Sequence, residues 1–271
     1  MSLYTVIGAG GFIGGRIAAR LTSRGDEVFS PGRDEAGWWD RPMGVVLYAA
    51  GLTGDFMERP FDTVEAHVSL LTQVLRAGHF DRIVYLSSTR LYDSLGAAGG
   101  REEDVLALDP ALPRNVYDLS KALGENLTVT RTGGRGVAAR LSNVFALDPA
   151  ASGFLPDLLA QARRRRDLSL AISPDGGRDY IHADDVDDAL LRLLDGDASG
   201  VVNVASGRPL LNRDLAAVFA DCGWRLELTG PESAPGQAAC DTSRLQSLGV
   251  RPRDPRDVIR EILQRPGFFQ G

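Results

Sequence analysis

A strand pattern that runs directly into a glycine-rich turn opens the chain and limits the folds available to it. Leu3–Ile7 is apolar and partly β-branched, and three glycines follow at three-residue spacing before apolar residues recur at helical intervals. Such a turn lets the backbone approach a pyrophosphate, and the helix N-terminus behind it favours negative charge. The opening predicts a dinucleotide-binding unit whose cofactor contacts are Gly8, Gly11, Phe12, Ile13 and Gly14.

Short apolar runs then alternate with helical patterns. We expect strands at 28–29, 45–50, 83–87 and 136–141, and helices at 61–77 and 116–130. Runs that are almost continuously apolar suit strands buried on both faces of a parallel sheet. The alternation of strand and helix predicts right-handed crossovers between the strands. The predicted fold class is therefore α/β, with a Rossmann-type doubly wound parallel sheet.

Beyond about residue 146 the pattern changes, and a smaller lobe is expected. Helical patterns at 155–166, 212–221 and 254–264 accompany a strand at 168–172, and Val201–Val204 has the pattern of a strand that rejoins the main sheet. We expect a dinucleotide-binding domain over 1–145 and a small interleaved C-terminal substrate lobe over 146–271, with 178–205 returning to the Rossmann sheet. Because few residues separate Ser30 from Ala50, the third strand of a complete domain is expected to be reduced or missing.

Composition and charge exclude several classes of protein. The chain has 30 basic and 36 acidic side chains and a net charge of −6, which argues against binding to nucleic acid or a membrane surface through bulk charge. No apolar stretch reaches the length of a membrane span. Two cysteines, Cys222 and Cys240, and three scattered histidines indicate no metal site. Without a signal-like N-terminus, the expected location is the cytoplasm.

The residues after the second strand pattern bear on the choice of dinucleotide. An acidic residue there typically binds the ribose of NAD, whereas an arginine accommodates the extra phosphate of NADP. Ser30 ends this strand pattern and Arg33 follows closely, which favours NADP. In the alternative interpretation, Arg33 is a solvated surface residue and Asp34 binds the ribose.

A tyrosine and a lysine stand four residues apart in the helix expected at 116–130. Tyr117 and Lys121 therefore share one helix face and can meet one substrate. A phenol has a pKa near 10, which an adjacent ammonium lowers by favouring the phenolate. Ser88 lies where the strand at 83–87 ends, at the edge of an α/β sheet where ligands bind. The pattern predicts an acid/base pair with a hydroxyl beside it.

Together these motifs resemble those of the extended short-chain dehydrogenase/reductases, which include nucleotide-sugar epimerases, dehydratases and ketoreductases. The resemblance rests on the glycine turn, the Tyr117/Lys121 pair and the segments 48–51, 86–92, 140–145 and 178–186. It implies that Tyr117 is the acid/base, that Lys121 tunes it and holds the cofactor, and that Ser88 is its hydroxyl partner.

The resemblance also assigns binding residues. It implies further cofactor contacts at Ala49, Ala50 and Gly51, and substrate contacts at Ser88, Thr89, Asn143 and Arg178, with Arg178 on the nucleotide diphosphate. A homodimer through the helices expected at 61–77 and 116–130 is implied in the same way.

Departures from the family pattern narrow the expected reaction. Thr89 and Arg90 stand where dehydratases of the family have Asp-Glu, so dehydration is not expected. His67 replaces a usual asparagine, and Tyr48 replaces a frequent histidine. The expected function is NADP-dependent 4-ketoreduction of a nucleotide-linked sugar by hydride transfer. The alternatives are a nucleotide-sugar 4-epimerase with retained NAD and a non-catalytic dinucleotide-binding sensor.

Overall fold

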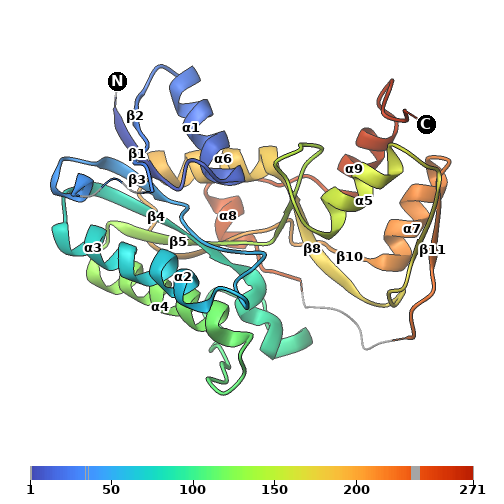
Figure 1. The fold of residues 1–271 in the computed structure, drawn as a ribbon, viewed down its shortest axis with the longest axis horizontal. Helices are drawn as coiled ribbons and strands as arrows, with labels where there is room; N and C mark the ends of the chain where they lie inside the picture. Colours follow the sequence, from blue (N-terminus) through green and yellow to red (C-terminus); the bar gives the residue numbers. More distant parts are fainter. Residues whose placement is uncertain (1, 34, 36, 233–238, 271) are drawn as a thin grey trace. The chain divides into compact units, whose positions relative to one another are not determined.

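The computed structural model describes residues 2–33, 35, 37–232 and 239–270 of the chain (Figure 1). Its main feature is a parallel sheet of six strands with the order β2-β1-β3-β4-β5-β9. These strands are β1 (Leu3–Ile7), β2 (Glu27–Phe29), β3 (Gly44–Tyr48), β4 (Phe80–Ser88), β5 (Gly136–Leu141) and β9 (Gly200–Val204). The sheet confirms the predicted α/β fold with a Rossmann-like doubly wound sheet.

Strand β1 lies between β2 and β3, so the order of the strands reverses there. In the described residues that connect β2 to β3, the regular structure is a short 3-10 turn, Trp38–Asp40. Trp38 is buried, with its ring edge-to-face with Phe29 at a centroid distance of 6.5 Å. Strand β2 is therefore an edge of the sheet, and a buried tryptophan packs against the side chain that ends it.

Helices cover both faces of this sheet. Figure 1 shows α1 (Phe12–Ser23) and α6 (Ala183–Asp195) on one face, and α2 (Pro60–Val64), α3 (Leu70–Ala77) and α4 (Asn115–Arg131) on the other. The sheet core between them contains fully buried side chains such as Val46, Leu71 and Ile83. Because α4 packs on β4 and β5, its inward face is held over the centre of the sheet.

The helix expected over 61–77 is present as a continuous helical segment, in which a π-helical turn, Glu65–Ser69, joins α2 to α3. Two tyrosine hydroxyls from the strands reach the backbone of this turn. Tyr48 donates to the carbonyl of Ala66 at 2.5 Å, and Tyr85 donates to that of His67 at 3.4 Å. Side chains that bond to helix carbonyls disturb the regular i to i−4 ladder, which is a known cause of such bulges.

The chain forms two compact units. Unit 1 consists of Met1–Ser94, Val105–Leu141 and Asp187–Asn203, and unit 2 of Leu95–Asp104, Ser142–Val186 and Val204–Gly271. The segment that returns to the six-stranded sheet is shorter than the expected 178–205. Its first part, β8 (Gly177–His182), pairs instead with β6 (Asn143–Phe145) and β10 (Pro209–Leu211) in a separate sheet.

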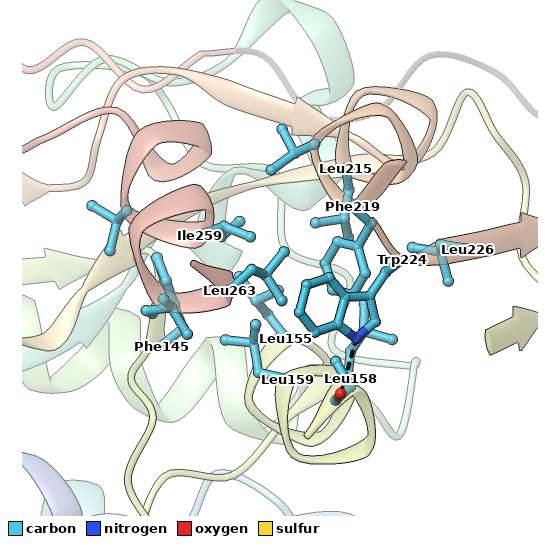
Figure 2. Close-up of a cluster of buried hydrophobic side chains, with 14 of the residues drawn as sticks. Phe145, Leu155, Leu158, Leu159, Leu215, Phe219, Trp224, Leu226, Ile259 and Leu263 are labelled. Atoms are coloured by element: carbon cyan, nitrogen blue, oxygen red, sulfur yellow. Dashed lines mark hydrogen bonds between the residues drawn. The ribbon is translucent and has the colours of Figure 1, made fainter. Parts of the chain in front are cut away.

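Unit 2 has its own hydrophobic core (Figure 2). Its remaining elements are α5 (Phe154–Ala162), β7 (Asp167–Leu170), α7 (Asn212–Asp221), β11 (Arg225–Leu228), α8 (Ser243–Ser247) and α9 (Pro255–Leu263). Trp224 lies among leucines of α5 and donates through Nε1 to the carbonyl of Ala162 at 2.9 Å. Helix α5 ends at Ala162, so the four arginines at 163–166 are not part of the helix, contrary to the pattern expected at 155–166. No helix in the described ranges is long and apolar enough to cross a membrane.

Candidate active site

Two glycines of the turn after β1 are required by the packing of the chain on itself. Gly8 has a φ of 90°, and a Cβ there would lie 2.7 Å from the backbone of both Ala49 and Ala50. A Cβ on Gly14 would lie 2.3 Å from the carbonyl oxygen of Gly8. These contacts draw the ends of β1 and β3 together where the strand order reverses, which is where ligands bind in open α/β sheets.

The outer part of the same turn is open. A Cβ on Gly10 would meet nothing within 4 Å, and the nearest atom to a Cβ on Gly11 is the Gly8 carbonyl oxygen at 3.4 Å. Gly11 begins α1 without a side-chain cap, and the first turn has no acidic residue. Phe12 and Ile13, in that first turn, are half-buried. The helix N-terminus therefore keeps its positive end for an anion, and the arrangement fits the pyrophosphate of a dinucleotide.

The strand end Ala49–Gly51 links this turn to the side chains of α4. The amide of Ala49 donates to the carbonyl of Ile7 at 2.8 Å, which extends the pairing of β3 with β1. A Cβ on Gly51 would lie 2.8 Å from Nε2 of His67 and 3.4 Å from Nζ of Lys121. The structure thus brings the predicted glycine turn, the predicted strand end and Lys121 into one continuous arrangement within unit 1.

Tyr117 and Lys121 lie one turn apart on α4, and both are buried. Burial raises the pKa of Tyr117, whereas a hydrogen bond from Ser88 and the charge of Arg90 lower it. The Arg90 amide donates to Oγ of Ser88 at 3.2 Å, so the Ser88 hydroxyl hydrogen is left to donate elsewhere. The predicted phenol and its hydroxyl partner are therefore in contact.

Lys121 is completely enclosed. Its Nζ donates to the carbonyl of Leu86 at 2.9 Å and lies 5.1 Å from the ring centroid of Tyr85 and 5.8 Å from that of Tyr117. Burial lowers the pKa of Lys121 to about 7, and the charge of Glu125 opposes that effect. The charge of Arg90 lowers the pKa of Tyr117. That Lys121 tunes Tyr117 stays a prediction.

His67 is a site residue that the sequence marked only as a departure from the family pattern. Its ring is fully buried, edge-to-face with that of Tyr117 at 5.3 Å, and its Nδ1 hydrogen-bonds with Oγ of Ser120 at 2.8 Å. Burial and the charge of Lys121 lower the pKa of His67 to about 2. The imidazole is therefore neutral at physiological pH.

Phe56 and Arg90 were missed as site residues. The Phe56 ring lies 5.2 Å from that of Tyr117, and the Arg90 guanidinium lies over both rings. Phe56 is in an irregular segment where no sequence pattern indicated a role. For Arg90 the signal was a basic residue at a position where the family has an acidic one.

The residues predicted to determine specificity for NADP or NAD follow β2. Ser30 and Arg33 are both exposed, and Asp34 lies outside the described residues. The Arg41 guanidinium lies 4.3 Å from the ring centroid of Phe29, which ends β2. The described residues near the end of β2 therefore include a second arginine, which sequence reasoning missed.

The predicted substrate residues are divided between the units. Thr89 is buried in unit 1, directly after Ser88. In unit 2, Asn143 lies on β6 and donates through Nδ2 to the carbonyl of Asp179 at 2.9 Å, and Arg178 lies exposed on β8. Across the described residues, no group of three or more His, Cys, Asp or Glu side chains could hold a metal ion.

Comparisons with known proteins agree with this arrangement. A model of the NAD dependent epimerase/dehydratase family matches residues 4–205. The chain is similar to dTDP-4-dehydro-6-deoxy-D-allose reductase of Streptomyces sp, with 25% identity over 296 aligned residues that cover 90% of this chain and 89% of that protein.

Solved structures show the same fold. MoeE5 in complex with UDP-glucose and NAD has a TM-score of 0.76 at 21% identity and covers 94% of this chain and 95% of its own. RMD from Pseudomonas aeruginosa complexed with NADPH has a TM-score of 0.72 at 23% identity and covers 99% of both chains. The resemblance drawn from the motifs is confirmed: this chain belongs to the NAD dependent epimerase/dehydratase family.

Proposed function

We propose that the protein is an NADP-dependent reductase that acts on the 4-keto group of a nucleotide-linked sugar. The observation that carries this proposal is the buried phenol of Tyr117, which lies one helical turn from Lys121 and interacts with Ser88. These groups stand beside a glycine turn suited to a dinucleotide. The similarity to a dTDP-sugar 4-ketoreductase supports the choice of substrate class.

The cofactor would be held by the turn Gly8–Gly14, the strand end Ala49–Gly51 and Lys121. When bound, the nicotinamide supplies the hydride. NADP is preferred because Arg33 is exposed after β2 and Arg41 lies over Phe29 at the end of that strand. A guanidinium matches the geometry of a phosphate, and the arginines on this side would recognise the ribose phosphate of NADP.

Tyr117 then acts as general acid. The phenol gives its proton to the carbonyl oxygen of the sugar, and Ser88 donates a hydrogen bond to the same oxygen as negative charge develops on it. Arg90 is permanently charged and lies 5.2 Å from the Tyr117 ring, where it stabilises the phenolate left behind. Asn143 and Arg178 are proposed as substrate-binding residues.

The test is to incubate the purified protein with NADPH and a panel of nucleotide-linked 4-ketosugars, and to follow NADPH absorbance and the products. We expect stoichiometric NADPH oxidation with formation of the 4-hydroxy sugar. Interconversion of 4-epimers without net oxidation would identify an epimerase instead, and cofactor binding without turnover would identify a sensor.

The Tyr117→Phe variant tests the assignment of the acid. It should lower kcat by ~100- to 10,000-fold, because proton transfer to the developing alkoxide is lost. NADPH affinity should stay near that of the wild type. Tyr4→Phe is the matched control, because the Tyr4 hydroxyl donates its hydrogen bond to Asp195, which is not a residue of the site. Near-normal turnover in Tyr117→Phe would refute the mechanism.

A further inference from the structure

The guanidinium of Arg90 lies over two aromatic rings of the site that are in contact with each other. It lies 4.6 Å from the ring centroid of Phe56 and 5.2 Å from that of Tyr117. The two rings are themselves 5.2 Å apart. Because the backbone of the same residue donates to Ser88, Arg90 is fixed at both ends, by its amide and by its ring contacts. Its charge therefore has a defined place beside the phenol.

Asp118, the residue after Tyr117, opposes this cation. Its Oδ1 lies 3.3 Å from Nε of Arg90, and the carboxylate is buried. Neither of these two atoms makes a hydrogen bond with the described residues, so the pair is an ionic contact. The charge of Asp118 raises the pKa of Tyr117, whereas that of Arg90 lowers it. Two opposite charges thus act on one phenol.

The other titratable groups around Tyr117 are either neutral or lose their charge near neutral pH. Tyr85 on β4 keeps its proton, because burial raises its pKa. His67 on the π-helical turn is neutral, and Lys121 on α4 has a pKa of about 7, so it carries a full positive charge only below neutral pH. A guanidinium does not lose its proton in proteins. Of the described groups that face Tyr117, Arg90 is the cation that persists as the pH rises.

Charges that reach the site indirectly act through Asp118. Burial raises the pKa of Asp118, and the charge of Arg90 opposes that effect. Arg114 also lowers this pKa and Asp93 raises it, and these two residues pair with each other at 3.3 Å. Their influence on the phenol is therefore partly cancelled. Arg90 and Asp118 remain as the charged residues that act directly on Tyr117.

We propose that Arg90 and Asp118 form a charge couple that sets the acidity of Tyr117, with Arg90 stabilising the phenolate and Asp118 opposing it. Arg90 is thus a positioning residue: it places a positive charge beside Tyr117 and acts on the reaction through that phenol, without acting on the substrate itself. The charge couple is a property of the free protein and does not depend on the proposed function. Only its consequence for catalysis rests on that function.

The test measures the titration of the phenol without any substrate. The protein is labelled with ¹³Cζ-tyrosine, and the Tyr117 signal is identified by its loss in Tyr117→Phe. Removing a nearby cation should raise the titration midpoint of this signal by about one pH unit in Arg90→Met. Removing the anion should lower it by about half a unit in Asp118→Asn. Arg90→Lys, whose ammonium loses its proton in the pH range in which the phenol titrates, should raise the midpoint by less than Arg90→Met does.

Two controls separate this effect from a general disturbance. Arg76→Met removes an exposed arginine of α3 and should leave the Tyr117 midpoint unchanged. Lys121 is the single lysine of the chain, so a ¹⁵Nζ-lysine spectrum gives one signal that reports whether the site is intact in each variant. If Arg90→Met does not fold, Asp118→Asn and Arg90→Lys still decide the question.

The outcomes are distinct. Opposite shifts in Arg90→Met and Asp118→Asn support the charge couple, even if no nucleotide sugar is turned over and the proposed function fails. Shifts in the same direction, or a Tyr117 midpoint in Asp118→Asn no lower than that of the wild type, overturn it. Where turnover is found, the alkaline limb of the kcat profile should move with the phenol in each variant.

Discussion

The single lysine of this chain is the residue whose chemistry its environment changes most. Every other strongly basic side chain is arginine. A buried ammonium can lose its proton, whereas a guanidinium cannot, so the two residues are not interchangeable at this position. Full burial lowers the pKa of Lys121 to about 7, which leaves a group that can both hold and release a proton at neutral pH. An arginine at 121 would keep its charge and lack this property.

Lys121→Met should stabilise the protein without cofactor at pH 7. Burying the ammonium costs ~1.4 kcal/mol per pKa unit below its usual value, and the lost hydrogen bond to Leu86 returns part of that. We expect a net gain of about 2 kcal/mol in the free energy of unfolding. Urea denaturation of the variant and the wild type at pH 7 measures it.

The same pair of proteins tests the pH dependence. Between pH 7 and the usual lysine value of 10.5, the unfolded chain binds a proton at residue 121 that the folded wild type does not. Wild-type stability relative to the variant therefore rises with pH through that window, and the advantage of Lys121→Met shrinks. An advantage that stays constant from pH 7 to 10 would show that the ammonium is not destabilised by burial.

At the scale of the element, a buried ion pair ties α4, which carries Tyr117 and Lys121, to the sheet. Glu125 accepts from Nε and Nη2 of Arg140, on β5, at 2.8 and 2.6 Å. Arg140 also donates to the hydroxyl of Tyr92 at 2.7 Å. Next to this pair, a Cβ on Gly124 would lie 2.3 Å from the hydroxyl oxygen of Tyr85. The helix can therefore approach the sheet only with glycine there.

Glu125→Gln should destabilise the protein by about 3 kcal/mol, because it leaves the buried Arg140 without its counter-charge. It should also lower the pKa of Lys121 further, since the charge of Glu125 raises that value. Chemical denaturation and the ¹⁵Nζ signal of Lys121 measure the two effects. Glu58→Gln, at an exposed position, is the control. If the titration of Lys121 is unchanged in Glu125→Gln, the charge of Glu125 does not affect the pKa of Lys121.

At the scale of the whole molecule, large apolar side chains are exposed on two neighbouring helices of unit 1. Phe61 on α2 is 88% exposed and Leu123 on α4 is 48% exposed, and α2 packs against α4. Large apolar side chains exposed on neighbouring helices mark interaction surfaces. We therefore propose the homodimer that the sequence resemblance implied, formed through this face.

Phe61→Asp together with Leu123→Asp should convert that dimer to a monomer, because each charge would be buried without a partner in a symmetric interface. Sedimentation velocity measures the state of assembly. Val105→Asp is a matched control, since Val105 is an apolar residue of the same unit that is 88% exposed. A wild-type protein that sediments as a monomer at micromolar concentration would contradict the proposal.

The sequence alone determined the features that depend on local spacing. Alternating strand and helix patterns predicted the doubly wound sheet, the glycine spacing predicted the turn, and the four-residue interval placed Tyr117 and Lys121 on one helix face. Each of these follows from backbone geometry over a few residues, so neighbours in the chain are enough to specify it.

Only the tertiary structure decided which side chains surround the phenol and where a helix takes a π-helical turn. Arg90, Phe56 and His67 meet Tyr117 from separate segments, and the π-helical turn depends on hydroxyls carried by two strands. Contacts between residues far apart in the chain depend on how the elements pack. Burial, Ser88 and Arg90 act on the pKa of Tyr117 through such contacts, whereas Asp118 is its neighbour in the chain.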